Sequence, residues 1–125
     1  MTRLQLARLR QRVRELKARR TALEYAAQKP HPMIAASLLE RRFRPGAPPA
    51  YYLSIPSPKT SRHLYVRKAH VEMARRQAGA WREFSQALAE WVRVNREIES
   101  HLRRIGKGRC RDIATLWGKQ GRERT

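Results

Sequence analysis

The sequence predicts an α+β fold that is mostly helical. Two long antiparallel coiled-coil helices flank a small antiparallel β-hairpin or meander, and a basic C-terminal tail follows. Apolar residues recur at alternating three- and four-residue steps in residues 2–28 and again in residues 69–102, which is the seam of a coiled coil. All seven prolines lie between Pro30 and Pro58. The β-prone runs at residues 51–55 and 63–67 predict the sheet.

The first long helix is expected over residues 2–28. Its seam consists of Leu6, Leu9, Val13, Leu16, Arg20, Leu23 and Ala27. Pro30 and Pro32 end the helix, because proline lacks the amide proton that a helix needs and restricts the residue before it. A helix with a single apolar stripe is not stable alone in water. We therefore expect it to pack on the second long helix as an antiparallel pair, or on another copy of the chain.

The second long helix is expected over residues 69–102. Its seam consists of Trp81, Phe84, Leu88, Trp91, Asn95, Ile98 and Leu102, with Ala80, Ala87 and Val94 beside it. Gly79 is a weak point within the helix, and Gly106 and Gly108 are expected to stop it. The polar seam residues Arg20 and Asn95 either fix the register by meeting or mark where the pairing opens.

A β-meander is expected over residues 35–68, which completes a single domain of residues 1–102. Residues 51–55 and 63–67 are short β-prone runs that read as a hairpin. Residues 37–43 form either a third strand or one turn of helix, and we favour the strand. Alternation along the hairpin directs Leu53, Ile55, Leu64 and Val66 toward the helices, and Tyr52, His63, Tyr65 and Arg67 outward. Tyr51 is expected to pack within the sheet.

Residues 103–125 are expected to form a flexible basic tail of the type that becomes ordered on nucleic acid. Within it, residues 112–117 can form a short capped helix. Ile113, Leu116 and Trp117 would then dock on a partner or on the main body of the protein.

The charge of the chain predicts a polyanionic partner. Its 125 residues include 29 Lys and Arg against 10 Asp and Glu, a formal net charge of +19. Residues 69–102 are neutral overall, so the neighbouring segments carry the whole excess. Like charges at this density repel one another, and a polyanion should therefore bind and stabilise the folded chain. Nucleic acid is the polyanion that we expect.

The sequence contains no apolar run of 18 residues, so we expect neither a transmembrane helix nor a membrane partner. The N-terminal segment lacks the apolar region of a secretory signal. Cys110 is the single cysteine, which excludes an internal disulfide. These features favour a cytoplasmic protein, and association with the nucleoid is compatible with them.

Sequence motifs for catalysis are absent. The chain contains no GxxxxGK[ST], GxGxxG or HExxH motif, and its four histidines have no carboxylate at metal-binding spacing. Glu83, Glu90 and Glu97 recur at seven-residue steps, which we interpret as a solvated helix flank that faces arginine. Cys110 has no general base beside it in the sequence. We therefore expect no enzymatic activity, no metal and no cofactor.

Basic residues, interleaved with tyrosines in the meander, are the candidate nucleic-acid-binding residues. They are Arg8, Arg10, Arg12, Arg14, Lys17 and Arg19 in the first helix, Arg41, Arg42, Arg44, Tyr52, Lys59, Arg62, Tyr65, Arg67 and Lys68 in the meander, and Arg103, Arg104, Lys107, Arg109 and Arg111 in the tail. Cations neutralise phosphates, and exposed aromatic rings stack on unpaired bases. The aromatic residues and the lack of a compact helix-turn-helix favour RNA slightly over duplex DNA.

The segments Ser37–Arg42, Tyr51–Ser54 and Lys59–Val66 resemble a family of short uncharacterised bacterial proteins that are encoded beside transposases and other mobile-element genes. The resemblance covers about residues 35–100. It implies a mobile-element or nucleic-acid setting. Members of that family usually carry a cysteine-rich insert where this chain has Arg44–Pro49, so a metal-binding role is not carried over.

Three functions remain open from the sequence. The first is a non-enzymatic nucleic-acid-binding accessory protein of a mobile-element or ribonucleoprotein system. The second is a DNA-binding subunit that assists a transposase or recombinase. The third is a coiled-coil oligomerising adaptor, in which the apolar seams bind protein and the charge meets an acidic partner. A homo-oligomer is compatible with each of them.

Overall fold

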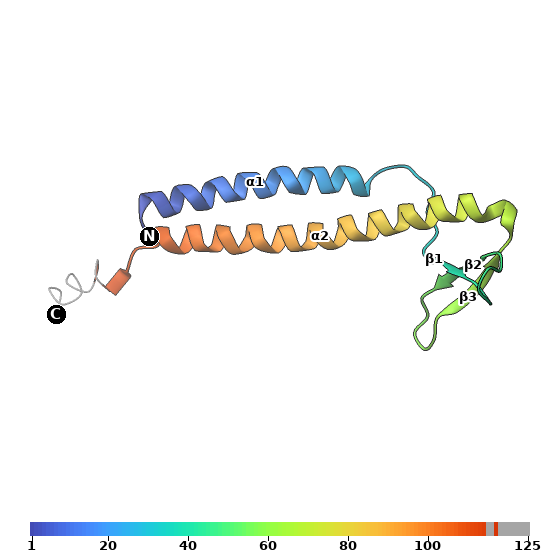
Figure 1. Cartoon of the computed structure of the whole chain (residues 1–125). Coiled ribbons are helices and arrows are strands. Elements are labelled where there is room, and N and C mark those ends of the chain that lie inside the picture. Colours follow the sequence, from blue (N-terminus) through green and yellow to red (C-terminus); the bar gives the residue numbers. More distant parts are fainter. Residues whose placement is uncertain (115–116, 118–125) are drawn as a thin grey trace. The chain divides into compact units, whose positions relative to one another are not determined.

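A computed structural model describes residues 1–114 and 117 of the chain. The elements follow in the order α1 (Arg3–Ala27), β1 (Ser37–Arg41), β2 (Ala50–Ile55), β3 (Arg62–Val66), the 3-10 turn η1 (Lys68–His70) and α2 (Val71–Arg109), as Figure 1 shows. Mostly helical α+β architecture is therefore confirmed. The chain divides into two compact units, one made of Met1–Arg20 with the chain from Val92 onward and the other of Thr21–Trp91.

A reciprocal pair of hydrogen bonds begins α1. The backbone amide of Gln5 donates to Thr2 Oγ1 at 3.1 Å, and the backbone amide of Thr2 donates to Gln5 Oε1 at 2.9 Å. This capping box satisfies two amides that a helix start leaves without partners. At the other end α1 stops at Ala27, shortly before Pro30. The predicted bounds of 2–28 are therefore correct to within one residue at each end.

In the first unit α1 and α2 run antiparallel, which confirms the predicted pairing there (Figure 1). The predicted seam of α1 is its contact face, since Leu9, Val13 and Leu16 are buried. Val94 and Ile98 are the buried apolar residues that α2 contributes to this unit. Both helices thus place their apolar stripes in a shared core, which is the physical reason that neither needs to be stable alone.

The prediction that α2 ends at residue 102 is wrong. The helix continues to Arg109, so residues 103–109 of the predicted flexible tail are helical. Gly106 and Gly108 do not stop it, because neither adopts the left-handed conformation of a helix-ending glycine. The last turns instead have packing partners: Ile105 is half-buried, and the side chain of Met1 lies against Gly108.

The predicted seam of α2 also needs correction. Leu88 and Leu102 are 44% and 49% exposed, whereas Ala87 and Val94, which we placed beside the seam, are buried. A straight α-helix has 3.6 residues per turn, so a stripe with a strict 3.5-residue period drifts by about 20° per heptad. Over the 39 residues of α2, the buried face therefore no longer coincides with the stripe predicted from the sequence.

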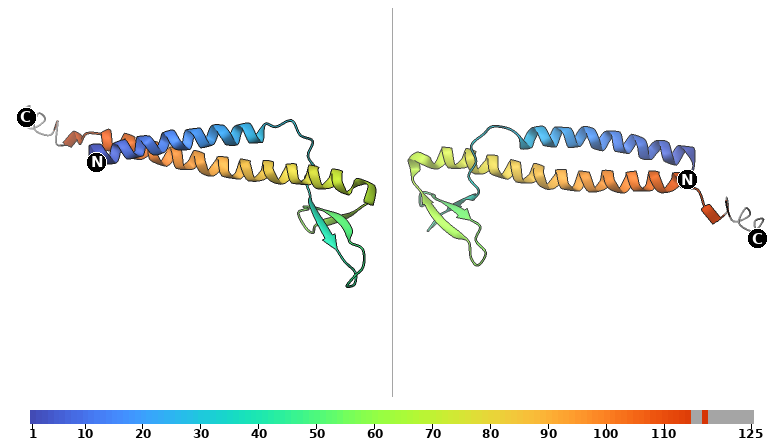
Figure 2. Two further views of the ribbon diagram at one scale, coloured as in Figure 1. Left: turned by 45° about the horizontal axis from the view of Figure 1, so that its top comes forward. Right: turned by 180° about the vertical axis from the view of Figure 1, so that it is seen from behind.

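The second unit contains a three-stranded antiparallel sheet in the order β1-β2-β3, and Figure 2 shows it from two sides. The expected meander and the choice of a strand for residues 37–41 are therefore confirmed. Val66 packs with Val71 and Ala74 at the start of α2, and Leu38, Tyr51 and Leu53 pack against that cluster. Leu53, Val66 and Tyr51 thus lie as predicted, but Leu64, on the edge strand β3, is 45% exposed.

Residues 28–36 connect α1 to the sheet and lie against α2 within the second unit. The backbone amide of Ile34 donates to the carbonyl oxygen of Gln77 at 3.0 Å. Ala36 is 3% exposed. This crossing segment positions β1, whose first residue follows directly.

After α2 the described chain includes Asp112, whose carboxylate accepts a hydrogen bond from the amide of Ala114 at 3.0 Å. Ile113 and Trp117 are each 66% exposed, so within the described residues they do not pack on the main body, and docking on a partner stays a prediction. Leu116 and residues 118–125 lie outside the described residues. Among the residues that are described, no helix has the length and apolar character needed to cross a membrane.

Candidate nucleic-acid interface

The outward face of the sheet gathers side chains from all three strands. Tyr52 on β2 pairs with Leu39 on β1 and with Tyr65 on β3, and Ser54 pairs with His63. Because successive side chains alternate between faces, these residues share one face with Arg41. It is the face opposite to that of Leu53 and Val66, which packs on α2. We call Arg41, Tyr52, His63 and Tyr65 the sheet-face cluster.

The sheet-face cluster is held together by direct contacts. The rings of Tyr52 and Tyr65 meet edge to face, with centroids 5.7 Å apart and planes at 69°. Arg41 Cζ lies 5.4 Å from the centroid of the Tyr52 ring, which is within the range of a cation–π contact. Arg41 Nη2 also lies 2.9 Å from His63 Nδ1. The rings are therefore positioned by neighbouring strands before any ligand arrives.

Exposure differs between the two tyrosines. Tyr65 is 64% exposed, while Tyr52 is half-buried beneath its neighbours. We predicted that both side chains point outward, and both lie on the outward face. Tyr65 is the ring that presents its surface to solvent, and Tyr52 supports it from the side.

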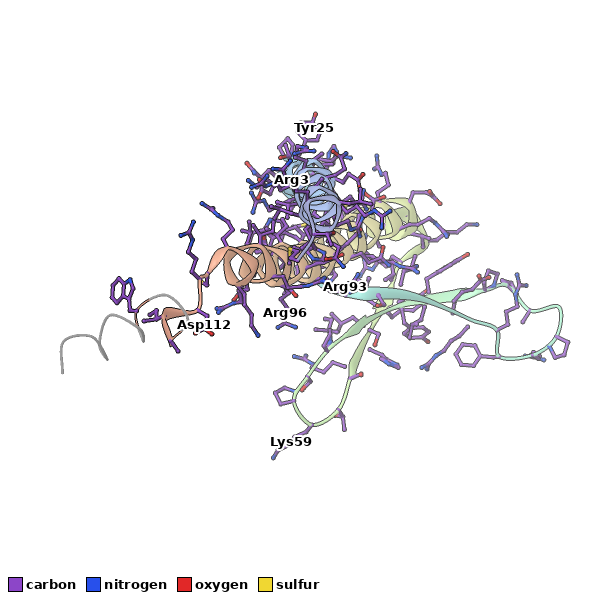
Figure 3. The ribbon with its side chains drawn as sticks, turned by 90° about the vertical axis from the view of Figure 1, so that its left-hand side faces the viewer. Arg3, Tyr25, Lys59, Arg93, Arg96 and Asp112 are labelled. Atoms are coloured by element: carbon purple, nitrogen blue, oxygen red, sulfur yellow. The ribbon has the colours of Figure 1, made fainter. Side chains whose placement is uncertain are left out.

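Exposed cations lie on β3, in η1 and in the loops that adjoin the sheet. Arg44, Lys59, Arg62, Arg67 and Lys68 are exposed, and within the described part of the chain none of their side chains makes a hydrogen bond or ion pair. Lys59 projects from the loop between β2 and β3 (Figure 3). Phe43, in the loop after β1, is 75% exposed. Arg42 differs, because it donates to the carbonyl oxygen of Ala47 at 3.1 Å and lies 3.5 Å from Glu40, so it shapes its own loop.

The predicted basic residues of α1 divide into two groups. Arg8 and Arg10 are exposed and have no hydrogen-bonded or ionic partner among the described residues, and Lys17 and Arg19 are also exposed. Arg14 donates to Gln11 on its own helix. Arg12 is engaged across the helix pair, where its Nε and Nη2 donate to Glu97 Oε1 at 3.2 and 3.1 Å.

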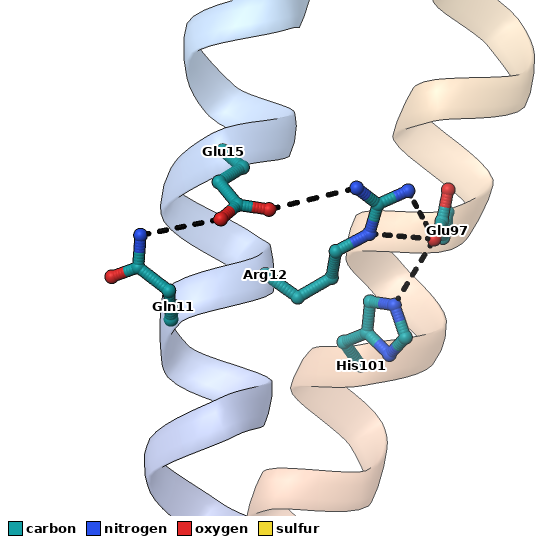
Figure 4. A network of polar contacts seen from close by, with 5 residues as sticks. All are labelled: Gln11, Arg12, Glu15, Glu97 and His101. Carbon is teal, nitrogen blue, oxygen red and sulfur yellow. Dashed lines mark hydrogen bonds and ion pairs between the residues drawn. The ribbon is translucent and has the colours of Figure 1, made fainter.

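Glu97 is the centre of a small polar network in the first unit (Figure 4). His101 Nε2 lies 3.3 Å from the oxygen that Arg12 contacts, and Arg12 Nη1 lies 3.6 Å from Glu15. The hydrogen bond from His101 lowers the pKa of the Glu97 carboxyl, partial desolvation opposes it, and the hydrogen bond and charge of Arg12 add to the lowering. The predicted contact between the glutamate row and arginine is thus present at Glu97, and Arg12 is a structural residue.

The basic residues predicted in the tail lie mostly on the last turns of α2. Arg103 forms an ion pair with Glu99 at 2.8 Å. Arg104, Lys107 and Arg109 are exposed and unpaired within the residues that the structure describes. Arg111 lies just beyond the helix. A regular helix therefore spaces most of these cations, where we had expected a flexible arm.

The sequence analysis did not identify the contacts that Arg75 and His101 make. Arg75 lies with Cζ 5.7 Å from the centroid of the Tyr51 ring, and His101 contacts Glu97. The i,i+4 spacing of Glu97 and His101 is a signal that was available. In the described ranges 1–114 and 117, no group of three His, Cys, Asp or Glu side chains is arranged to hold a metal ion.

Comparisons with protein-family models, with curated proteins and with solved structures give no match. The resemblance of residues 35–100 to proteins encoded beside transposases therefore stays a prediction. The arrangement of this chain's own residues is therefore the basis of the function proposed for it.

Proposed function

We propose that this chain is a non-enzymatic nucleic-acid-binding accessory protein that stacks an unpaired base on the sheet-face cluster and holds the phosphate backbone with surrounding cations. RNA is slightly preferred over DNA as the ligand. A mobile-element or ribonucleoprotein system is the proposed setting, and it rests on the sequence resemblance of residues 35–100.

The contact between Tyr52 and Tyr65 carries this proposal. An exposed tyrosine whose edge is already supported by a second ring loses little side-chain freedom when a base stacks on it. Tyr65 has that support from Tyr52 at 5.7 Å, and Arg41 and His63 lie on the same face. Base–aromatic stacking contributes about 1–3 kcal/mol per base and tolerates different sequences.

The distribution of charge supports the same ligand. Arg62 begins β3 and Arg67 follows its last residue, and both side chains are exposed and have no hydrogen-bonded or ionic partner among the described residues. A cation next to a stacking ring is positioned to contact the phosphate of the stacked nucleotide. Few side chains on this face are suited to reading base edges, so we expect weak sequence preference.

Fluorescence anisotropy with labelled oligonucleotides tests the proposal. A single-stranded RNA, the single-stranded DNA of the same sequence and a duplex are compared over a series of salt concentrations. We expect the order RNA, then single-stranded DNA, then duplex, with affinity falling steeply as salt rises. Tyr65→Ala should weaken single-strand binding by about tenfold or more, the loss of one stacked base.

Tyr25→Ala is the matched control. Tyr25 is 76% exposed on α1 and projects from that helix (Figure 3), outside the sheet-face cluster. Equal losses from Tyr65→Ala and Tyr25→Ala would mean that the cluster is not the binding surface. Preferential binding of the duplex would favour the alternative of a DNA-binding subunit that assists a transposase or recombinase.

A second candidate function is the oligomerising adaptor, and the exposure of Leu88 and Leu102 favours it. These leucines belong to the predicted seam of α2 but are 44% and 49% exposed, so they are available to another protein surface. A partner bound through apolar side chains should stay bound in 0.5 M salt, where nucleic acid dissociates (about 3–5 Å screening length at such ionic strengths). Retention of a protein partner through that wash, with no nucleic acid bound at low salt, would favour the adaptor.

A further inference from the structure

Positive side chains from both helices line one hollow in the first unit. The hollow has a volume of about 490 Å³, and its lining includes Arg8 and Arg12 of α1 together with His101 and Arg104 of α2. Its lining residues belong to the first unit, whereas those of the sheet-face cluster belong to the second. We refer to it as the interhelical hollow.

Some of the positive charges that line the interhelical hollow have no acidic partner among the described residues. Arg12 is paired with Glu97 at 3.1 Å, and that carboxylate is shared with His101. Arg8 and Arg104 have no acidic partner in the part of the chain that the structure describes. Two helices therefore bring two uncompensated guanidinium groups to the same concave surface. Their mutual repulsion is relieved when an anion binds between them.

The network around Glu97 keeps the remaining lining in place (Figure 4). An ionised carboxylate can only accept hydrogen bonds, so Arg12 and the Nε2 of His101 act as donors to Glu97. Their side chains are thereby oriented without a ligand. The other ring nitrogen of His101, Nδ1, is buried and has no hydrogen-bond partner within the described residues. A buried polar atom without a partner is unfavourable, so a ligand group that forms a hydrogen bond with this nitrogen stabilises the site.

We propose that the interhelical hollow is a phosphate site, in which Arg8 and Arg104 contact a phosphoryl group and Arg12 and His101, both held by Glu97, complete its wall. Guanidinium groups are the side chains best suited to this ligand, because their planar forks donate two parallel hydrogen bonds to phosphate oxygens. The phosphoryl group that it takes in the complex is one of a nucleic-acid backbone. This part of the proposal rests on the proposed function.

The first test uses inorganic phosphate and does not depend on nucleic acid. Phosphate is titrated into the labelled full-length chain at constant ionic strength, with chloride as the balancing anion, and the His101 ring resonance is followed by NMR. We expect a saturable shift of that resonance. Arg8→Gln and Arg104→Gln should each weaken phosphate binding by about tenfold, the loss of one charge-assisted contact.

Arg103→Gln is the matched control, because it removes the same charge from the next residue of α2, whose guanidinium is paired with Glu99 at 2.8 Å. It should leave the phosphate affinity unchanged. A shift that rises linearly without saturation, or an equal loss from Arg103→Gln and Arg104→Gln, would overturn the phosphate site. Far-ultraviolet circular dichroism of each variant checks that both helices are intact.

The second test separates this site from the proposed function. A single-stranded oligonucleotide is added in place of phosphate, and the same His101 resonance is followed. A shift that inorganic phosphate competes away supports a backbone phosphate in the hollow. If the oligonucleotide binds in a Tyr65-dependent way but leaves His101 unmoved, the backbone assignment is wrong and the proposed function stands. If phosphate saturates the hollow but no oligonucleotide binds, the anion site stands and the proposed function is wrong.

Discussion

Arg20 and Asn95 meet across the helix pair of the first unit, where Arg20 Nη1 donates to Asn95 Oδ1 at 3.2 Å. They are the polar members of two otherwise apolar seams, and both are half-buried. Of the two outcomes expected from the sequence, register fixing is the one that this contact favours, because sliding either helix would separate the pair. A polar pair of this kind restricts how two apolar stripes can align.

We expect Asn95→Leu to lower the free energy of unfolding by about 1–2 kcal/mol, because it removes a hydrogen bond to a half-buried charged group. Urea denaturation followed by circular dichroism measures the change. The conservative variant Asn95→Asp retains an acceptor oxygen and should lose less. The double variant Arg20→Leu/Asn95→Leu should recover stability through apolar contact. A double variant less stable than either single variant would contradict this account.

Glycine substitutions should separate helical positions from Gly46, the glycine with a positive φ in the described part of the chain. No atom lies within 4 Å of a Cβ built at Gly79 or Gly106, and both lie within α2. Gly79→Ala and Gly106→Ala should therefore each raise the free energy of unfolding by about 0.5–1 kcal/mol. Gly46 has a φ of 79°, so Gly46→Ala should lower it by about 1–2 kcal/mol. Urea midpoints measure all three, and a loss at Gly106 would mean that α2 ends before it.

The stability of the first unit should depend on acid pH through Glu97. Its pKa is held below the ordinary value of 4.5, chiefly by the hydrogen bond from His101. A carboxyl group whose pKa is lowered by folding stabilises the folded state above its unfolded pKa. That contribution is lost as the pH falls from about 4.5 through the lower folded value. Thermal unfolding at a series of pH values should show a shallower fall for Glu97→Gln in this range. Parallel curves for the two proteins would show that Glu97 is not responsible.

Neighbouring residues of α2 provide a test of where its buried face lies. Ala87 is 8% exposed and Leu88 is 44% exposed. Ala87→Gln should destabilise the fold by about 1–3 kcal/mol, because it forces a larger polar side chain into a packed site. Leu88→Gln should change the stability by less than about 0.5 kcal/mol. If Leu88→Gln destabilised the fold more than Ala87→Gln, the seam predicted from the sequence would be correct.

Measurements of self-association test whether the exposed leucines of α2 bind a second copy of the chain. If exposed leucines bind a second copy of the chain, Leu88→Gln and Leu102→Gln should each shift the sedimentation equilibrium toward monomer without loss of helix content. Each leucine is exposed, so the change acts on association and leaves folding intact. An unchanged equilibrium for both variants would show that these leucines do not hold copies of the chain together.

Local sequence was sufficient for most of the secondary structure. Alternation and turn residues, which are short-range signals, favoured a strand within residues 37–43 and placed Tyr52 and Tyr65 on the outward face of the hairpin. The bounds of α1 follow from Pro30 at one end, and the capping box of Thr2 and Gln5 was readable from their spacing at the other. The candidate cations are readable from charge alone, because exposure is the default state of arginine and lysine.

Tertiary structure decided which of these residues are available. Arg12 belongs to the basic face by sequence, but it is neutralised by Glu97, which lies 85 positions away along the chain. Tertiary packing also buries Ala87 and leaves Leu88 exposed, and α2 continues past Gly106, where the side chain of Met1 lies against Gly108. Local patterns determine what a segment can form, because backbone hydrogen bonds and side-chain alternation act over a few residues. Only contacts between distant segments decide which charges are paired, which leucines are covered and where a helix stops, because these depend on the neighbour that each side chain meets in the folded chain.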